Sequence, residues 1–338
     1  MNHFVKNKRP LLDKFGKLNE PGYAFTEVFD YNPEMISASK WRIKEWDYYA
    51  ILSNDYSLSF TIADLGYIGL AKVSFFDFKE RVEFTKEKKI LFPFGRFNLP
   101  KSINSGDVLF QKKGFVLRFL NEKNRRRLIV EVNNLYKRKN LRVDLSLQKI
   151  NTDHLTIATP WKENPKAFYY NQKINCLPVS GKVYLDGEEF TFSPKKTFAV
   201  LDWGRGVWPY KSTWYWSNGS GVVDGKRFGF NFGYGFGDNS KATENMLFYD
   251  GKGYKLKDVE FNYNKNDYLD IWTIKSKDMS VDLKMKPIYD RMDNTNFLII
   301  KNYGHQVFGK FSGKVKIAKQ VLEVKDVLGF AEVITNHY

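Results

Sequence analysis

Cysteine and histidine are scarce in this sequence of 338 residues, and each scarcity excludes a class of site. The single cysteine, Cys176, cannot form an intramolecular disulfide, so it predicts a reducing compartment, the cytoplasm. A lone thiol of this kind is typical of a small buried packing residue. The four histidines lie far apart in the sequence. Because a zinc site needs clustered His or Cys ligands, we expect no metal site.

Long apolar runs are also missing. No stretch reaches the roughly 18 apolar residues that a membrane-spanning helix needs. The basic N-terminus, residues 1–10, is not followed by the apolar region of a secretory signal. There is no phosphate-binding P-loop, zinc-protease motif or serine-hydrolase elbow, and residues 233–238 lack the third glycine of a dinucleotide loop. We therefore expect no cofactor.

Positive charge, in contrast, is abundant, with a formal net charge of +16. The densest basic runs, residues 86–89, 123–127 and 137–139, lie between strand-like segments, where turns are expected. This placement favours solvated loops over a specific nucleic-acid site. A weak peripheral attraction to anionic membranes remains an alternative, and nothing indicates an oligomeric state.

Strand patterns dominate the chain. Residues 141–147 read Leu-Arg-Val-Asp-Leu-Ser-Leu, which alternates strictly and predicts one buried and one solvated face. Asp-Gly pairs at 186–187, 224–225 and 250–251 each separate two strand-like segments and predict β-hairpins. Helical patterns are limited to residues 35–44 and a turn at 152–158. The sequence therefore predicts an all-β fold of antiparallel sheet, closed or nearly closed into barrels.

Two packed β-domains are expected. Residues 158–165 contain two prolines and interrupt the strand pattern, whereas strand-like segments lie on both sides. We therefore expect an N-terminal β-domain at residues 1–157 and a C-terminal β-domain at residues 158–338.

The most informative segment lies in the second of these domains. Half of the 8 tryptophans occur at residues 203–216, directly after the apolar run 198–201 that delivers Asp202. In residues 228–237, aromatic residues alternate with glycine, so one strand face is left open around Asn231. Glu244 follows shortly afterwards.

Two interpretations of this segment remain open. In one, glycine allows the sheet to bend, the indoles fill a barrel, and Asp202 and Arg205 form a buried ion pair. In the other, Asp202, Arg205, Asn231 and Glu244 surround a cavity with aromatic walls. Burial favours the neutral form of a carboxylic acid, which can act as a general acid, unless a nearby cation cancels the effect.

Several segments resemble the bacterial family catalogued as domain of unknown function 2804. They are Leu201-Asp-Trp-Gly-Arg-Gly-Val-Trp-Pro-Tyr, Asn231-Phe-Gly-Tyr-Gly-Phe-Gly-Asp and Thr243-Glu-Asn-Met-Leu-Phe-Tyr-Asp-Gly. The likeness extends over nearly the whole chain, from Trp46-Asp-Tyr-Tyr-Ala-Ile to Gly329-Phe-Ala-Glu. The family name itself implies no activity.

A more distant resemblance is to the carotenoid hydratase and AttH-like group. It rests on Tyr169-Tyr170, Pro178-Val-Ser-Gly, Asp202-Trp203-Gly204 and the closing Gly329-Phe-Ala-Glu332. Asn171 and Lys173 depart from the Arg-rich spacing expected after the tyrosines. The resemblance implies two lipocalin-like barrels and hydratase, cyclase or isomerase chemistry on lipophilic substrates, often through protonation of a double bond.

Three functions follow from these observations. The first is an enzyme without a redox cofactor that binds a hydrophobic or amphipathic small molecule. The second is a non-catalytic carrier of such a molecule, and the third is a carbohydrate-binding or carbohydrate-processing protein. The candidate catalytic residues are Asp202, as the proton donor, Arg205 and Glu244. The candidate ligand-binding residues are Tyr170, Asn171, Lys173, Trp203, Trp208, Tyr210, Trp214, Trp216, Asn231 and Glu332.

Overall fold

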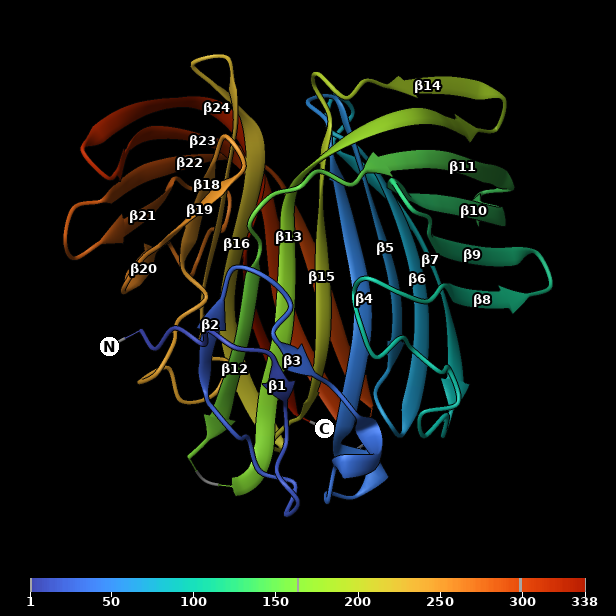
Figure 1. The fold of residues 1–338 in the computed structure, drawn as a ribbon. Coiled ribbons are helices and arrows are strands. Elements are labelled where there is room, and N and C mark those ends of the chain that lie inside the picture. Colours follow the sequence, from blue (N-terminus) through green and yellow to red (C-terminus); the bar gives the residue numbers. More distant parts are fainter. Residues whose placement is uncertain (1, 163, 298–299, 338) are drawn as a thin grey trace.

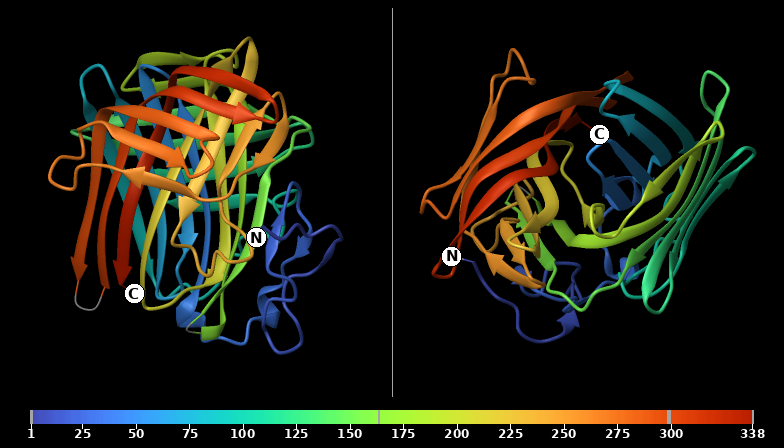
Figure 2. Two further views of the ribbon diagram at one scale, coloured as in Figure 1. Left: turned by 90° about the vertical axis from the view of Figure 1, so that its left-hand side faces the viewer. Right: turned by 90° about the horizontal axis from the view of Figure 1, so that it is seen from above.

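The computed structural model describes residues 2–162, 164–297 and 300–337, and it is almost entirely β (Figure 1). Within these residues, helix is limited to two short 3-10 turns, η1 (Pro33–Met35) and η2 (Lys40–Arg42). The strands form two curled antiparallel half-barrels that pack against each other, as the views in Figure 2 show. The expected fold class is therefore confirmed.

The first half-barrel is a sheet with the strand order β7-β6-β5-β4-β15-β13-β11-β10-β9-β8. Two further strands pair with β13, and a third pairs with one of these two. The bounds along the path are β7 (Val82–Leu91), β6 (Ile68–Asp77), β5 (Tyr56–Asp64), β4 (Ile43–Leu52), β15 (Phe198–Val207), β13 (Asn164–Leu185), β11 (Lys139–Gln148), β10 (Arg125–Tyr136), β9 (Phe115–Asn121) and β8 (Val108–Lys112). The added strands are β12 (Leu155–Trp161) and β14 (Glu188–Phe192) on β13, and β2 (Gly22–Ala24) on β12.

The second half-barrel is a sheet with the strand order β19-β18-β17-β16-β24-β23-β22-β21-β20. Its bounds are β19 (Lys252–Lys255), β18 (Met246–Tyr249), β17 (Lys226–Tyr234), β16 (Lys211–Val223), β24 (Gln320–His337), β23 (Ile300–Ile317), β22 (Val281–Phe297), β21 (Trp272–Ser276) and β20 (Val259–Asn262). The N-terminal segment adds a small parallel pair, β1 (Arg9–Pro10) with β3 (Phe29–Asp30).

The three Asp-Gly pairs form the predicted hairpins, between β13 and β14, β16 and β17, and β18 and β19. Both residues of each pair have positive φ, as a type I′ turn requires. The helical turn predicted at 152–158 is wrong, because β12 begins at Leu155 and is held by β13 and β2 on its two sides. Residues 35–44 contain part of η1 and all of η2 but no longer helix.

The hydrophobic core links the two half-barrels. One buried cluster fills the first half-barrel and continues into Phe308 and Phe330 of the second. The rings of Phe76 and Phe308 lie 4.7 Å apart across this junction. The chain passes from one sheet to the other between Val207 and Lys211, later than the expected boundary at 157/158. Sheet membership alone does not define folding units, so the domain boundary stays a prediction. Within the described residues, no helix has the length and apolar character to cross a bilayer.

Candidate functional site

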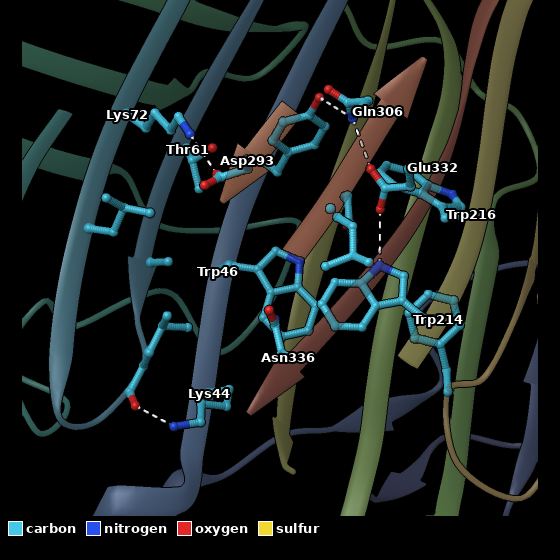
Figure 3. Close-up of a pocket in the computed structure, with 18 of the residues that line it drawn as sticks. Lys44, Trp46, Thr61, Lys72, Trp214, Trp216, Asp293, Gln306, Glu332 and Asn336 are labelled. Carbon is cyan, nitrogen blue, oxygen red and sulfur yellow. Dashed lines mark hydrogen bonds and ion pairs between the residues drawn. The ribbon is translucent and has the colours of Figure 1, made fainter. Parts of the chain in front are cut away.

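A pocket of about 280 Å³ lies where the two half-barrels face each other (Figure 3). Strands β4, β5, β6, β13 and β15 line it from the first half-barrel, and β16, β22, β23 and β24 line it from the second. Strand alternation selects the side chains that reach it. On β4, for example, Lys44, Trp46 and Tyr48 line the pocket, whereas Glu45 and Asp47 bind to groups on the other face.

Aromatic rings form much of the pocket wall. The Trp208 ring lies 5.8 Å from Trp46 and 5.4 Å from Trp214, in both cases edge to face. Phe236 stacks on Tyr169 at 4.9 Å. The alternation predicts Phe236 on the same strand face as the aromatic residues at 228, 230, 232 and 234, but β17 ends at Tyr234 and the next residue, Gly235, has a φ of +94°. This turn brings the Phe236 ring into the pocket wall.

A buried cluster of charged groups lies beneath the aromatic wall. Lys173 on β13 is 1% exposed, and its Nζ lies 2.8 Å from Asp202 Oδ1 and 3.9 Å from Glu244 Oε2. Asn171 donates a 2.7 Å hydrogen bond to the same Asp202 oxygen. The Lys173 ammonium also lies 4.1 Å from the centre of the Trp216 ring, within the range of a cation–π contact. Asp202 therefore lines the pocket as one half of an ion pair.

Glu244 and Asn231 lie behind this ion pair. Tyr169 donates a 2.5 Å hydrogen bond to Glu244 Oε1, and Asn231 donates to the Glu244 backbone carbonyl at 2.8 Å. Burial raises the pKa of Glu244, and the nearby Lys173 partly opposes the shift. Asn231 also accepts from Trp216 Nε1 at 2.7 Å. Glu244 and Asn231 therefore contact the residues around the ion pair but are not part of the pocket lining, whereas Tyr169 and Trp216 are.

Glu332 on β24 is another of the three carboxyl groups on the pocket wall, with Asp202 and Asp293. It is 5% exposed and accepts from two neutral donors, Trp214 Nε1 at 3.0 Å and Gln306 Nε2 at 2.9 Å. Burial raises its pKa to about 7; Trp214, Lys173 and Gln306 lower it, and Asp202 raises it further. Figure 3 shows Glu332 with its two donors at one end of the pocket, and Lys44 at the other.

Polar contacts between the half-barrels form one side of the pocket. Lys72 on β6 pairs with Asp293 on β22 at 2.9 Å. Arg291 on β22 pairs with Glu83 on β7 at 3.2 Å and donates to Gln306 Oε1 at 3.3 Å. Glu332 is thus connected, through Gln306 and Arg291, to an ion pair between the two sheets.

Three of the expected site residues lie on the opposite face of the first sheet. Arg205 pairs with Asp47 at 2.9 Å and stacks on Trp203, with 3.8 Å between guanidinium carbon and ring centre. Tyr170 packs edge to face on Trp203 and donates to the Phe29 carbonyl. The expected proximity of Arg205 to Asp202 is therefore wrong, because residues three apart on a strand point to opposite faces.

Of the remaining expected residues, most line the pocket, but Tyr210 and Asn171 do not. Tyr210 is 53% exposed and packs against the His337 ring, outside the pocket lining. Asn171 is buried outside the pocket lining and donates to Asp202, which is part of that lining. The expected residues that line the pocket are Lys173, Asp202, Trp208, Trp214, Trp216 and Glu332.

Sequence reasoning missed the pocket residues of β4, β22 and β23, notably Trp46, Tyr48, Arg291 and Gln306. Their strands lie far in sequence from the aromatic segment. One usable signal was present, because Lys44-Glu-Trp-Asp-Tyr places a lysine and two aromatic residues on one strand face. Across the described residues, no group of three or more His, Cys, Asp or Glu side chains is arranged to hold a metal ion.

Comparison with known proteins adds the fold and the family. A putative AttH from Nitrosomonas europaea has a similar structure, with a TM-score of 0.51 and 13% identity over 91% of this chain and 98% of that chain. Kievitone hydratase from Nectria haematococca matches with a TM-score of 0.47 and 10% identity, over 96% and 98%. At 13% identity the likeness to the AttH structure shows the fold alone, and no curated protein matches the chain. The model of the family described as "Domain of unknown function (DUF2804)" matches residues 2–338, and the chain belongs to this family.

Proposed function

We propose that the pocket binds a hydrophobic or amphipathic small molecule and that a carboxyl group on its wall protonates this molecule without a redox cofactor. Hydration, isomerisation and cyclisation are the reactions of this type. The observation that carries the proposal is that two of the three carboxyl groups lining the pocket, Asp202 and Glu332, lie beside its aromatic rings, whereas the third, Asp293, is paired with Lys72. Asp202 is the donor expected from the sequence, and Glu332 is the other candidate.

The aromatic wall supports an apolar ligand over a sugar. A carbohydrate platform needs a flat indole face that a sugar ring can cover. Here Trp208 is 4% exposed and is surrounded by the rings of Trp46, Trp161 and Trp214. Because these indoles cover one another's faces, they do not form a sugar platform. They form an apolar wall instead, against which apolar ligand surface can be buried.

Ligand binding is tested with the apolar fluorescent probe N-phenyl-1-naphthylamine. Ala63 lies on the pocket wall and is 4% exposed, so an Ala63→Phe substitution places a ring inside the pocket. We expect the wild type to bind the probe and Ala63→Phe to bind at least about tenfold more weakly. Leu109→Phe, at a site that is 58% exposed outside the pocket, is the matched control. Equal affinity in all three proteins would reject this pocket as the binding site.

Proton transfer separates an enzyme from a carrier. The ligand that co-purifies with the protein from its host is identified by mass spectrometry and then incubated with the protein in D₂O. Protonation at carbon places deuterium in the product, whereas a carrier returns the ligand unchanged. We expect uptake with the wild type and none with the double variant Asp202→Asn/Glu332→Gln. A bound ligand without deuterium would leave the carrier function in place.

Two further proposals concern the cellular location of the protein and its interactions with membranes and nucleic acids. We propose a cytoplasmic location and, from the net charge of +16, a weak attraction to anionic membranes without specific nucleic-acid binding. Co-sedimentation with anionic and with neutral vesicles tests the membrane attraction, which increased salt should abolish.

A further inference from the structure

Asp202 and Glu332, the two candidate donors on the pocket wall, have different partners. Asp202 accepts from an ammonium, that of Lys173, and from the Asn171 amide, both at Oδ1. Glu332 accepts from an indole and an amide, one at each oxygen, and it has no ion pair within the described residues. A buried carboxyl group without a cationic partner favours its neutral form, whereas a directly bound ammonium favours the charged form.

We propose that Glu332 is the proton donor and that Asp202, which is paired with Lys173, is the group that takes up the proton released later in the reaction. This assignment rests on the proposed function, and it replaces the donor expected from the sequence. Two carboxyl groups whose surroundings favour opposite protonation states are a common arrangement for acid–base catalysis.

The chemical step requires no partner other than the ligand and, for hydration, water. The Glu332 proton moves to one carbon of a double bond, and the π electron pair forms the new C–H bond. The neighbouring carbon becomes cationic, and Glu332 becomes a carboxylate. Loss of a proton from an adjacent carbon to Asp202 re-forms a double bond. In hydration, a water oxygen instead bonds to the cation and Asp202 accepts the water proton.

The surroundings of Glu332 suit both products of the proton transfer, the carboxylate of Glu332 and the cation on the ligand. After the proton leaves, Trp214 Nε1 and Gln306 Nε2 already donate to the new carboxylate. The faces of the aromatic rings on the pocket wall stabilise a cation formed on the ligand. Gln306 is itself held by Arg291, which donates to its Oε1, and by the Tyr48 hydroxyl, to which its amide donates.

The titratable and charged groups that surround Glu332 come from four strands. They are Tyr48 on β4, Lys173 on β13, Asp202 on β15 and, through Gln306, Arg291 on β22. With a pKa of about 7, Glu332 is present in both protonation states near neutral pH. A donor with such a pKa can both release a proton and regain it from solvent in each cycle.

The protonation state is tested without any ligand, by infrared spectroscopy of the carboxyl C=O band as a function of pH. We expect a neutral-carboxyl band that disappears as the pH rises through about 7. The band should be absent in Glu332→Gln and retained in Asp202→Asn. Glu323→Gln, at an exposed position on the same strand, should behave as the wild type. A band that persists in Glu332→Gln but is lost in Asp202→Asn would overturn the assignment.

The donor role is tested by deuterium uptake into the co-purified ligand, with native mass spectrometry to confirm that each variant retains the ligand. We expect Glu332→Gln to lose uptake while still binding. Undiminished uptake in Glu332→Gln would overturn the donor role but not the proposed function. No uptake in the wild type would instead reject the proposed function, and the donor role with it.

Discussion

At the scale of single residues, Lys173 is notable because its buried ammonium lies within 3.9 Å of two carboxyl groups. Its Nζ lies 2.8 Å from Asp202 and 3.9 Å from Glu244, and the residue is 1% exposed. Removal of one partner from a buried ion pair leaves an uncompensated charge, and this costs far more than loss of a surface pair.

We therefore expect Lys173→Met to lower the free energy of unfolding by about 3–5 kcal/mol. Lys182 forms a 2.9 Å pair with Glu189, but their side chains are 52% and 39% exposed, so Lys182→Met should lower the free energy of unfolding far less. Urea unfolding at neutral pH measures both values. Equal costs would show that the buried cluster is not held by its charges.

Glu332 should also make stability depend on pH. Its pKa is about 7 in the folded protein, against an ordinary value of 4.5. Between these values the folded state keeps a proton that the unfolded state has released, so the unfolding free energy falls as pH rises from about 4.5 to about 7. The shift corresponds to about 3 kcal/mol.

Glu332→Gln removes this contribution. The stability of the variant relative to the wild type should therefore rise by about 3 kcal/mol between about pH 4.5 and about pH 8. Urea unfolding of both proteins across this range measures the difference. A difference that stays constant with pH would contradict the shifted pKa.

Strand parity explains which site residues the sequence could indicate. Asp202 and Lys173 reach the same cluster because β13 and β15 pair them directly in register. That register depends on long-range pairing, which the local sequence does not specify. The opposite placement of Arg205 was predictable, since it lies an odd number of residues from Asp202 on one strand. The pairing of Arg205 with Asp47 was not, because Asp47 lies on a strand distant in sequence.

At the scale of elements, the turns that adjacent residues determine were predictable, whereas a strand that depends on distant partners was not. The Asp-Gly hairpins were predictable because two adjacent residues determine the turn. Strand β12 was not, because its hydrogen bonds come from β13 and β2, and its sequence does not alternate. Each sheet also contains a glycine at a backbone conformation that other residues rarely adopt. These glycines are Gly181 on β13 and Gly313 on β23, with φ of +132° and +144°.

Alanine at Gly313 should disturb the sheet. Its Cβ would overlap the Asp282 carbonyl oxygen on the neighbouring strand, in addition to the strained φ. We expect a loss of about 3 kcal/mol from overpacking and backbone strain together. Gly225, with φ of +72° and open space around it, is the control, and its replacement by alanine should cost only about 1 kcal/mol. Thermal or urea unfolding gives both values, and equal losses would contradict the role of the close backbone approach.

At the scale of the whole molecule, the two half-barrels share a core instead of meeting at a polar surface. Phe308 of the second half-barrel is 1% exposed and contacts Phe76 and Phe78 of the first at ring distances of 4.7 and 5.4 Å. The ion pair between Lys72 and Asp293 crosses the same junction. Neither half-barrel can therefore unfold without exposing apolar surface of the other.

This coupling predicts one cooperative unfolding transition, with coincident urea curves from far-ultraviolet circular dichroism and tryptophan fluorescence. Leu283 is fully buried in a hydrophobic cluster confined to the second half-barrel, so the Leu283→Ala substitution removes packing contacts within that half-barrel. If the halves are coupled, this variant lowers the midpoint of the whole transition, with a cost of about 2–5 kcal/mol. Two separate steps, of which Leu283→Ala shifts only one, would show independent domains. In that case the pocket would lie between bodies free to move apart, and ligand access would not require any opening within a half-barrel.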